Sequence, residues 1–348
     1  MKFPATLKLF ILMAALSTGL LLLPGCDSDE TGTGATDTVG ADTAVSGADD
    51  PGAHGSVPET TGSTVMPPKA AAPFDPAKLG TVERDVTYGN AGGVQLKMDI
   101  YYPKQMAEPV PAVMYVHGGG WTEGNKDNGA GAKMISPLQD AGFLVVSIDY
   151  RLAPEYKFPA QIEDVKCAVR FLRANATQFG IDPGRIGAIG GSAGGHLVSL
   201  LGVTDENAGL EGSGGSAGQS SRVQAVVDMF GPSDLSQEFG GGAAGNALGS
   251  SVFGTSDRGS DILKQASPVT YVSADDPAFL ILQGDQDNLV PPSQSQELHD
   301  VLQAAGVPST LVMVKNAGHG FKPDGGAISP TLQELNSMIV DFFSRELK

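Results

Sequence analysis

Residues 185–201 join a short apolar run, suited to a β-strand, to a run with helical periodicity through Gly-Gly-Ser-Ala-Gly at 190–194. A serine on so sharp a turn must adopt a strained backbone, and neighbours without bulky side chains leave room for it. A strand, a Gly-x-Ser-x-Gly turn and a helix in this order form a nucleophile elbow, which exposes the serine hydroxyl at the edge of a sheet. Ser192 is therefore the candidate nucleophile.

The same five letters recur at residues 214–218, in a chain that has 47 glycines among 348 residues. The second copy lies in a Gly- and Ser-rich stretch with no apolar run before it and no helical pattern after it. Ser216 is therefore interpreted as part of a flexible loop.

The folded part of the chain alternates between strand and helix patterns. After a half-exposed strand at 94–101, paired with 82–88, the strands become continuous apolar runs, which are typical of strands buried on both faces. The expected further strands are 112–116, 143–148, 186–189, 223–227, 279–282 and 310–314, and the expected helices are 130–141, 160–175, 193–202, 292–305 and 329–346. We predict the α/β class, with one domain over 79–348, a mostly parallel doubly wound sheet and a minimal cap. The Gly-rich stretches 204–222 and 240–256 are expected to be loops over the sheet.

The residues before this domain lack the composition of a folded unit. Two lysines precede an apolar stretch at 9–23, shorter than the roughly 20 residues of a spanning helix, and the Leu-Pro-Gly-Cys that ends it resembles a bacterial lipobox. This predicts a lipoprotein signal peptide over 1–25 and a lipidated Cys26; ordinary signal cleavage and an uncleaved anchor are the alternatives. Residues 26–78 are acidic and rich in Gly, Ser, Thr and Pro, so we expect a disordered tether that holds the domain outside the cytoplasm on a bacterial membrane.

Charge and cysteine content narrow the classes of partner. The formal net charge of −17 disfavours nucleic acid. With Cys26 lipidated, Cys167 has no disulfide partner, and its helical surroundings indicate a packed free thiol.

Ser192 needs a base and an orienting carboxylate, because a serine hydroxyl is a poor nucleophile at neutral pH. Of the five histidines, His319 is the one that follows the last apolar run. It lies between two glycines, so its imidazole can turn back over the sheet. The carboxylate is expected after the strand at 279–282, where Asp285 and Asp287 compete. We favour Asp287, because a residue deeper in the turn can point back under the imidazole, while Asp285 bonds turn amides.

A His-Gly-Gly-Gly-Trp sequence follows the apolar run at 112–116. Glycines leave backbone N–H groups unshielded, so the N–H groups of Gly118 or Gly119 and of Ala193 are the candidate oxyanion hole. His117 is expected to brace this loop rather than ionise. For Trp121 two interpretations stay open, a wall of the substrate site and a core residue.

Together these motifs resemble an α/β-hydrolase esterase, as does the chain order Ser, Asp, His. Within that superfamily the chain is similar to the bifunctional feruloyl and acetyl xylan esterase-like branch. It is less similar to the hormone-sensitive-lipase branch, which usually has Asp where this chain has Gly191. Gln283 stands where a histidine is common before the Gly-x-x-Asp turn. The resemblance rests on five segments: 117–121, Asp-Tyr-Arg-Leu-Ala-Pro at 149–154, the Ser192 elbow, 284–291 and Gly-His-Gly-Phe at 318–321.

The resemblance implies a carboxylesterase in which Ser192 attacks a short-chain acyl ester, His319 moves the proton and Asp287 orients the imidazole. It points to acetyl or feruloyl groups on polysaccharide, and it implies no cofactor and no metal. Two alternatives stay open. An arylformamidase-like amidase would use the same triad, and a surface-binding protein with a hydrolase fold would not be catalytic.

Overall fold

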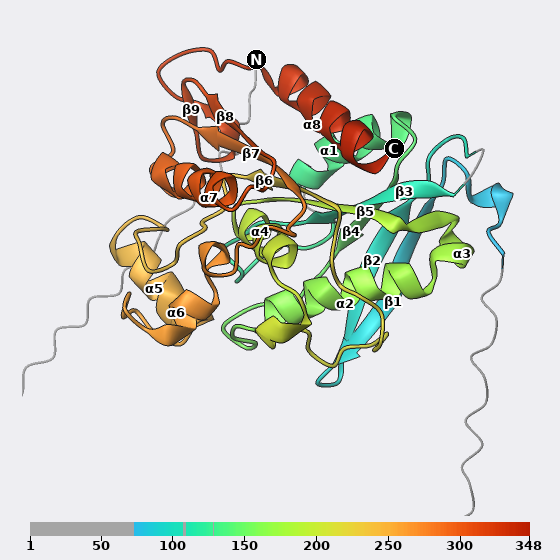
Figure 1. Ribbon diagram of the computed structural model, residues 1–348, viewed down its shortest axis with the longest axis horizontal. Helices are drawn as coiled ribbons and strands as arrows, with labels where there is room; N and C mark the ends of the chain where they lie inside the picture. The colour runs from blue at the N-terminus through green and yellow to red at the C-terminus, as the bar shows by residue number, and fades with distance from the viewer. Residues whose placement is uncertain (1–72, 107–108, 128) are drawn as a thin grey trace, which may run out of the picture. The chain divides into compact units, whose positions relative to one another are not determined.

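The computed structural model describes residues 73–348 except 107, 108 and 128, and these residues belong to one compact unit. The predicted α/β class is confirmed. An eight-stranded sheet, in the order β1-β2-β4-β3-β5-β6-β7-β8, has helices on both faces (Figure 1). Strand β2 pairs antiparallel with β1 and β4, and the other pairs are parallel.

The strands follow the hydrophobic patterns of the sequence. Every residue of β4, β6 and β7 is buried, as expected for continuous apolar runs between two layers of helices. Strand β1 lies at the edge and has exposed as well as buried positions. The strands are β1 (Val82–Ala91), β2 (Val94–Tyr101), β3 (Val110–Val116), β4 (Leu144–Ile148), β5 (Ile181–Gly191), β6 (Ala225–Met229), β7 (Ala278–Gly284), β8 (Ser309–Val314) and a small second sheet of β9 (Ala317–Gly318) with β10 (Lys322–Pro323).

Two hydrophobic cores lie on opposite faces of the sheet. Helices α1 and α8 cover one face, and α2, α4 and α7 cover the other (Figure 1). The helices are α1 (Gly129–Asp140), α2 (Ala160–Ala174), α3 (Ala176–Phe179), α4 (Ala193–Val203), α5 (Ala243–Val252), α6 (Asp261–Gln265), α7 (Pro292–Ala304) and α8 (Leu332–Leu347).

Of the two Gly-rich stretches predicted as loops, 204–222 is a loop apart from one short 3-10 turn (Glu206–Ala208), whereas the prediction is wrong for 240–256. Residues 243–252 form helix α5, and Leu248 of this helix lies against Gly120, since a Cβ on Gly120 would be 3.4 Å from the Leu248 side chain. Residues 204–222 connect the end of α4 to the start of β6, and the Gly214 carbonyl in this segment accepts the Asn90 N–H of β1 at 2.8 Å. Ser216 is in a loop, with neither a strand before it nor a helix after it, as predicted.

The predicted signal peptide, Cys26 and most of the tether lie outside the described residues. Phe74, which precedes β1, packs on the domain, and its ring centroid lies 5.8 Å from that of Tyr102. None of the helices in the described part of the chain combines the length and apolar character needed to span a bilayer. Cys167 is a buried free thiol, in agreement with the packed thiol that the sequence predicts.

Candidate active site

Ser192 lies at the turn between β5 and α4, with φ 57° and ψ −122°, a conformation that is costly for a residue with a side chain. The glycines beside it are required by close backbone contacts. A Cβ on Gly190 would lie 2.3 Å from the Gly194 oxygen, and a Cβ on Gly194 would lie 2.1 Å from the Val116 oxygen. The Ser192 N–H donates to the Met229 carbonyl at 2.9 Å, which fixes the turn to the end of β6.

Three residues predicted from separate strands meet at the carboxyl edge of the parallel sheet. His319 Nε2 lies 2.9 Å from Ser192 Oγ, and His319 Nδ1 lies 2.7 Å from Asp287 Oδ2. The Asp287 side chain is fully buried, while that of His319 is 24% exposed. In this arrangement Nδ1–H donates to Asp287, so Nε2 is free to accept the Ser192 hydroxyl proton.

Of the two competing carboxylates, the structure brings Asp287 to the histidine. Its Oδ1 accepts the N–H groups of Leu289 and Val290, each at 2.9 Å. Burial acts to raise the pKa of Asp287, but the hydrogen bonds from His319 and these amides outweigh it and hold the pKa below its ordinary value. Asp285 instead lies near a turn amide, with the Ala317 N–H 3.4 Å from its Oδ1.

Phe230 is a neighbour of the triad that the sequence analysis missed. Its ring centroid lies 4.9 Å from that of His319 and 4.9 Å from that of Phe321, both edge to face. Its φ of 47° is unusual for an aromatic residue and turns the chain at the end of β6. The available signal was its position, because it directly follows an apolar strand at the edge where Ser192 also lies.

Beneath this turn lies Asp228, a fully buried carboxyl group. Its Oδ1 accepts the Gly231 N–H at 2.9 Å. Burial raises the pKa of Asp228 to about 7, against the opposing effects of the Gly231 amide and the Ser199 hydroxyl. A Cβ on Gly195 would lie 2.3 Å from Oδ1, so this carboxyl group also abuts the first turn of α4.

The predicted oxyanion loop lies beside the serine. A Cβ on Gly118 would be 3.4 Å from the Ser192 Cβ and 2.8 Å from the Gly191 oxygen, so a larger residue would collide with the elbow. The backbone N–H groups of Gly118, Gly119 and Ala193 donate to no described residue. Backbone N–H groups without acceptors, next to the nucleophile in sequence or in space, are the kind of donor that stabilises a negative oxygen.

His117 and Trp121 support this loop from inside the protein. His117 stacks on Tyr150 at 4.2 Å between ring centroids, and burial lowers its pKa to about 4, so its neutral ring donates from Nδ1 to the Gly118 oxygen at 2.7 Å. This agrees with a bracing role. Trp121 is 2% exposed, and its Nε1 donates to His196 Nδ1 at 3.2 Å. Of the two interpretations of Trp121, the structure favours the core residue over a wall of the substrate site.

No group of three or more His, Cys, Asp or Glu side chains in the described part of the chain is arranged to hold a metal ion.

A serine, an aspartate and a histidine in this chain order, with the serine on a strand-turn-helix elbow at the carboxyl edge of a mostly parallel sheet, define the α/β-hydrolase class of proteins. The expected resemblance is confirmed by comparison with known proteins. The chain belongs to the BD-FAE family, whose model matches residues 98–302.

Esterases are among the known relatives of the chain, which spans less than two thirds of the length of the curated relatives LipC, LipM and LipQ. It is 33% identical to Esterase LipC of Mycobacterium tuberculosis over 258 residues, which cover 72% of this chain and 63% of LipC. Among solved structures, a truncated carbohydrate esterase from gut microbiota is 33% identical, with a TM-score of 0.67 over 79% of this chain and 99% of that one. Thermogutta terrifontis esterase 2 phosphorylated by paraoxon is 26% identical, with a TM-score of 0.63 over 76% of this chain and 94% of that one.

Proposed function

We propose that this protein is a serine carboxylesterase that hydrolyses short-chain acyl esters. The observation that carries the proposal is the continuous hydrogen-bonded chain from Ser192 Oγ through His319 to Asp287. Esterase relatives support the same class of reaction. A surface-binding protein without catalysis would need neither the hydrogen bonds that connect Ser192, His319 and Asp287 nor the strained Ser192 backbone.

The reaction follows from the positions of these groups. Ser192 Oγ attacks the ester carbonyl carbon as its proton passes to His319 Nε2, and the carbonyl oxygen becomes an oxyanion facing the N–H groups of Gly118 or Gly119 and Ala193. The tetrahedral intermediate collapses, and the leaving alcohol takes the proton from Nε2. Water then gives a proton to Nε2 and attacks the acyl-enzyme carbonyl. As the second tetrahedral intermediate collapses, the bond to Ser192 Oγ breaks, Oγ takes the proton back from Nε2, and the carboxylic acid leaves. Asp287 stabilises the imidazolium formed in both halves.

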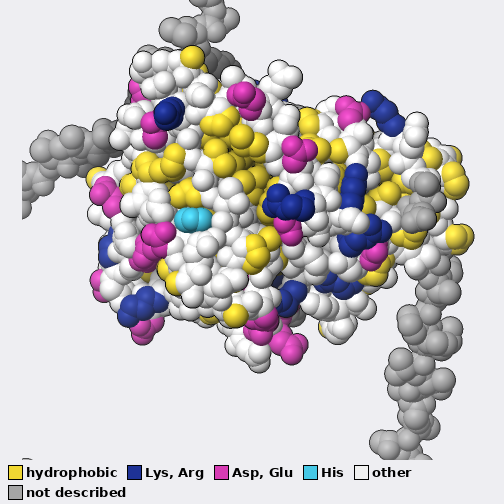
Figure 2. All heavy atoms as spheres, turned by 45° about the horizontal axis from the view of Figure 1, so that its top comes forward, with side chains coloured by type: hydrophobic (Ala, Val, Ile, Leu, Met, Phe, Trp, Pro, Cys, Tyr) yellow, Lys and Arg dark blue, Asp and Glu magenta, His cyan; other side chains and the backbone are white. Residues whose placement is uncertain are grey.

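The surroundings of the triad support a short acyl group and a bulky alcohol. In the described part of the chain, the α-helices between β6 and β7 are short, with ten residues in α5 and five in α6. Apolar side chains lie near the site: Phe230 beside His319, Leu248 against Gly120, and the 42% exposed Leu289, whose N–H donates to Asp287. Figure 2 shows hydrophobic side chains gathered over part of one face of the molecule, with single charged side chains among them.

We further propose acetyl or feruloyl groups on polysaccharide as the substrates. A carbohydrate esterase among the structural relatives supports this choice. Each further acyl methylene gains about 0.8 kcal/mol only where an apolar wall buries it. Acetyl p-nitrophenyl esters should therefore be preferred to butyryl esters, with steep loss beyond about eight acyl carbons.

The deciding experiment is turnover of p-nitrophenyl acetate by the protein and by Ser192→Ala. Turnover lost in the variant supports the esterase, and no turnover in the unaltered protein refutes it. Faster cleavage of N-formylkynurenine than of acetyl esters would favour the arylformamidase-like alternative. Acetate release from acetylated xylan tests the polysaccharide, and faster turnover of long-chain triglyceride emulsions would indicate a lipase instead.

We also propose that lipid on Cys26 anchors the protein to a bacterial membrane, with the domain in the periplasm or at the cell surface. The Leu-Pro-Gly-Cys sequence supports this. Cys26→Ser should abolish labelling by a radioactive fatty acid while a protein starting at residue 73 stays active. An unmodified Cys26 in the mature native protein, measured by intact mass, would refute the anchor.

A further inference from the structure

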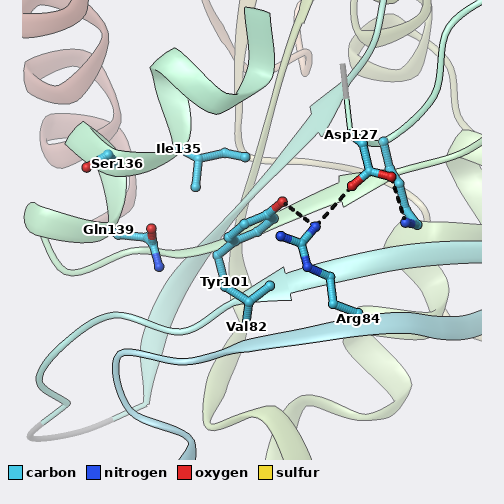
Figure 3. A pocket seen from close by; sticks show the side chains of 8 residues that line it. Val82, Arg84, Tyr101, Asp127, Ile135, Ser136 and Gln139 are labelled. Carbon is cyan, nitrogen blue, oxygen red and sulfur yellow. Dashed lines mark hydrogen bonds and ion pairs between the residues drawn. The ribbon is translucent and has the colours of Figure 1, made fainter. Parts of the chain in front are cut away.

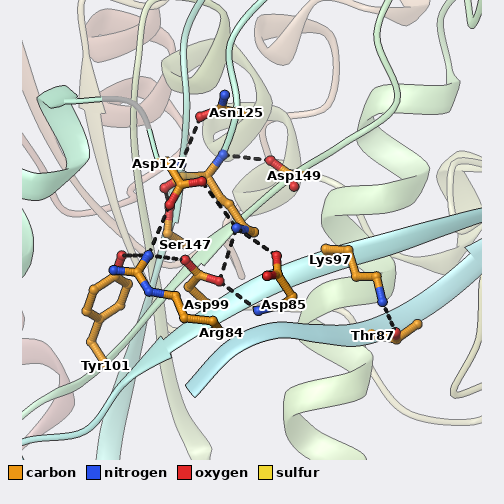
Figure 4. Close-up of polar contacts among 11 residues, drawn as sticks. Arg84, Asp85, Thr87, Lys97, Asp99, Tyr101, Asn125, Asp127, Ser147 and Asp149 are labelled. Atoms are coloured by element: carbon orange, nitrogen blue, oxygen red, sulfur yellow. Dashed lines mark hydrogen bonds and ion pairs between the residues drawn. The ribbon is translucent and has the colours of Figure 1, made fainter. Parts of the chain in front are cut away.

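An ionic cluster outside the triad contains the carboxylates of Asp85, Asp99 and Asp127 (Figure 4). The ammonium group that they share belongs to Lys126, on the chain segment that follows the Gly118 loop. The ammonium Nζ lies 3.0 Å from Asp85 Oδ1, 3.2 Å from Asp99 Oδ1 and 3.3 Å from Asp127 Oδ2. The Lys126 side chain is 8% exposed, and that of Asp99 is fully buried. Because Asp85 belongs to β1 and Asp99 to β2, the cluster ties this segment to the antiparallel edge of the sheet.

The main chain of Lys126 is held by the end of β4. Its N–H donates to Asp149 Oδ1 at 2.6 Å, and its carbonyl accepts the Ser147 hydroxyl at 2.6 Å. Burial acts to lower the pKa of the Lys126 ammonium, but the surrounding carboxylates outweigh it and raise the pKa, so the group is charged. Main chain and side chain together fix this residue to β1, β2 and β4.

The loop between β3 and Lys126 needs such an attachment because its backbone is unusual. Gly119, Gly120, Trp121 and Gly124 have φ values of 115°, 58°, 59° and 104°. A positive φ is costly for Trp121, which carries a Cβ. Conformations of this kind persist only where the surrounding structure imposes them.

The segment that enters the loop, at His117 and Gly118, is in direct contact with the segment that leaves it, at Gly124. This contact links Lys126 to the glycines of the candidate oxyanion hole. A Cβ on Gly124 would lie 2.5 Å from His117 Nδ1 and 2.6 Å from the Gly118 oxygen. A shift of the chain at Gly124 would therefore displace Gly118. Lys126, two residues after Gly124, fixes the position of this segment through its contacts with β1, β2 and β4.

Arg84 occupies the solvent side of the cluster. Its guanidinium pairs with Asp99 and Asp127, is 52% exposed and lines a pocket of about 370 Å³ between the first two strands and α1 (Figure 3). The buried Asp99 thus keeps one cationic partner when the Lys126 charge is removed. A neutral substitution of Lys126 should therefore still allow folding.

We propose that Lys126 is a positioning residue of the oxyanion loop, acting through Gly124 on Gly118 without touching the substrate. This role rests on the proposed esterase function. The attached loop keeps its N–H groups aimed at the developing oxyanion, so they need no reorganisation during the reaction.

The test compares Lys126→Met, which removes the charge but keeps an unbranched chain, with Lys104→Met. Lys104 forms an exposed ion pair with Asp140 on the surface, so its variant is a matched control. In Lys126→Met we expect kcat for p-nitrophenyl acetate to fall about tenfold to hundredfold, since losing an oxyanion donor outright costs about a hundredfold to a thousandfold. KM should stay nearly unchanged.

Two further measurements separate positioning from a general structural role. Affinity for a trifluoromethyl ketone, whose serine adduct carries an oxyanion, should fall by a similar factor, and Lys126→Arg should restore much of both losses. All rates are expressed per active site titrated with a fluorophosphonate, so a smaller folded fraction does not lower them. Lys104→Met should match the unaltered protein in each measurement.

An unchanged kcat per titrated site in Lys126→Met would overturn the proposal, as would a raised KM with kcat unchanged. If Lys126→Met fails to fold, Asp85→Asn decides, because it removes one carboxylate partner whose side chain is 68% exposed. We then expect a smaller loss of kcat, about threefold. An unchanged kcat in Asp85→Asn would refute the positioning role. Absence of ester turnover in the unaltered protein refutes the proposed function itself, whereas an active protein with an unaffected Lys126 variant refutes the positioning role alone.

Discussion

The side-chain amide of Gln283 donates to Oδ2 of Asp287 at 3.3 Å, the same oxygen that accepts from His319 at 2.7 Å. Gln283 is fully buried, and its amide oxygen accepts the Ser295 hydroxyl at 2.9 Å. A glutamine at a position where related chains commonly have histidine thus supplies a donor to the carboxylate. The departure from the family pattern keeps local support for Asp287.

Gln283→Leu should lower kcat for p-nitrophenyl acetate about threefold to tenfold, because one hydrogen bond contributes about 1 kcal/mol and 1.4 kcal/mol is a factor of ten. Gln283→His, which retains a ring N–H donor, should lose less. Ser295→Ala is the control, since it removes the other partner of the same amide and should lower stability without lowering kcat. Equal kcat losses in Gln283→Leu and Ser295→Ala would contradict this.

Ser192→Ala should abolish ester turnover, with a loss of about a millionfold in kcat, as is typical of a triad nucleophile. Ser216→Ala, in the second Gly-Gly-Ser-Ala-Gly copy, should leave turnover nearly unchanged, because Ser216 lies in a loop that packs on β1 and α2, whereas His319 contacts Ser192. Steady-state kinetics on both purified variants checks this. Comparable losses in the two would refute the assignment of Ser192.

Asp287→Asn should lower kcat by up to about ten-thousandfold, because the amide no longer holds the imidazole in the tautomer that accepts the Ser192 proton. Asp285→Asn should have a much smaller effect, since its carboxylate lies near a turn amide. Kinetics on folded variants, verified by circular dichroism, makes the comparison. The reverse ranking would transfer the role to Asp285.

Asp228 should make stability depend on pH. Its folded-state pKa of about 7 lies above the unfolded value of about 3.9, so between these values the folded protein holds a proton that the unfolded chain has released. The free energy of unfolding should therefore fall as pH rises through this window and level off above it. Asp228→Asn keeps the acceptor for Gly231 and cannot ionise, so it should lack this component.

Urea unfolding at about pH 5 and about pH 7.5 measures the effect. Over this range the unaltered protein should lose about 2 to 3 kcal/mol relative to Asp228→Asn. Asp300→Asn, an exposed substitution on α7, should track the unaltered protein. Parallel pH profiles for the unaltered protein and Asp228→Asn would contradict a buried proton on Asp228.

Local patterns in the sequence were enough to predict the class of fold and the candidate triad. Continuous apolar runs indicate strands buried on both faces, and helical periodicity between them indicates a parallel sheet with helices on both sides. The carboxyl ends of such strands share one edge, so residues that closely follow strands can be expected to meet. Ser192, Asp287 and His319 each follow a strand, and Gly118 lies two residues after the end of β3.

Only the tertiary structure decided which neighbouring groups act together. Turn geometry gave a reason in the sequence to favour Asp287 over Asp285. The contact between Asp287 and His319, however, depends on how β7 and β8 pair. Trp121 lies in the core, and Phe230 lies against His319 from a different strand. The Lys126 cluster joins residues of three neighbouring strands: Asp85 of β1, Asp99 of β2, and Asp149 directly after β4. Such contacts depend on the relative positions of elements far apart in sequence, which the periodicity of any one element does not specify.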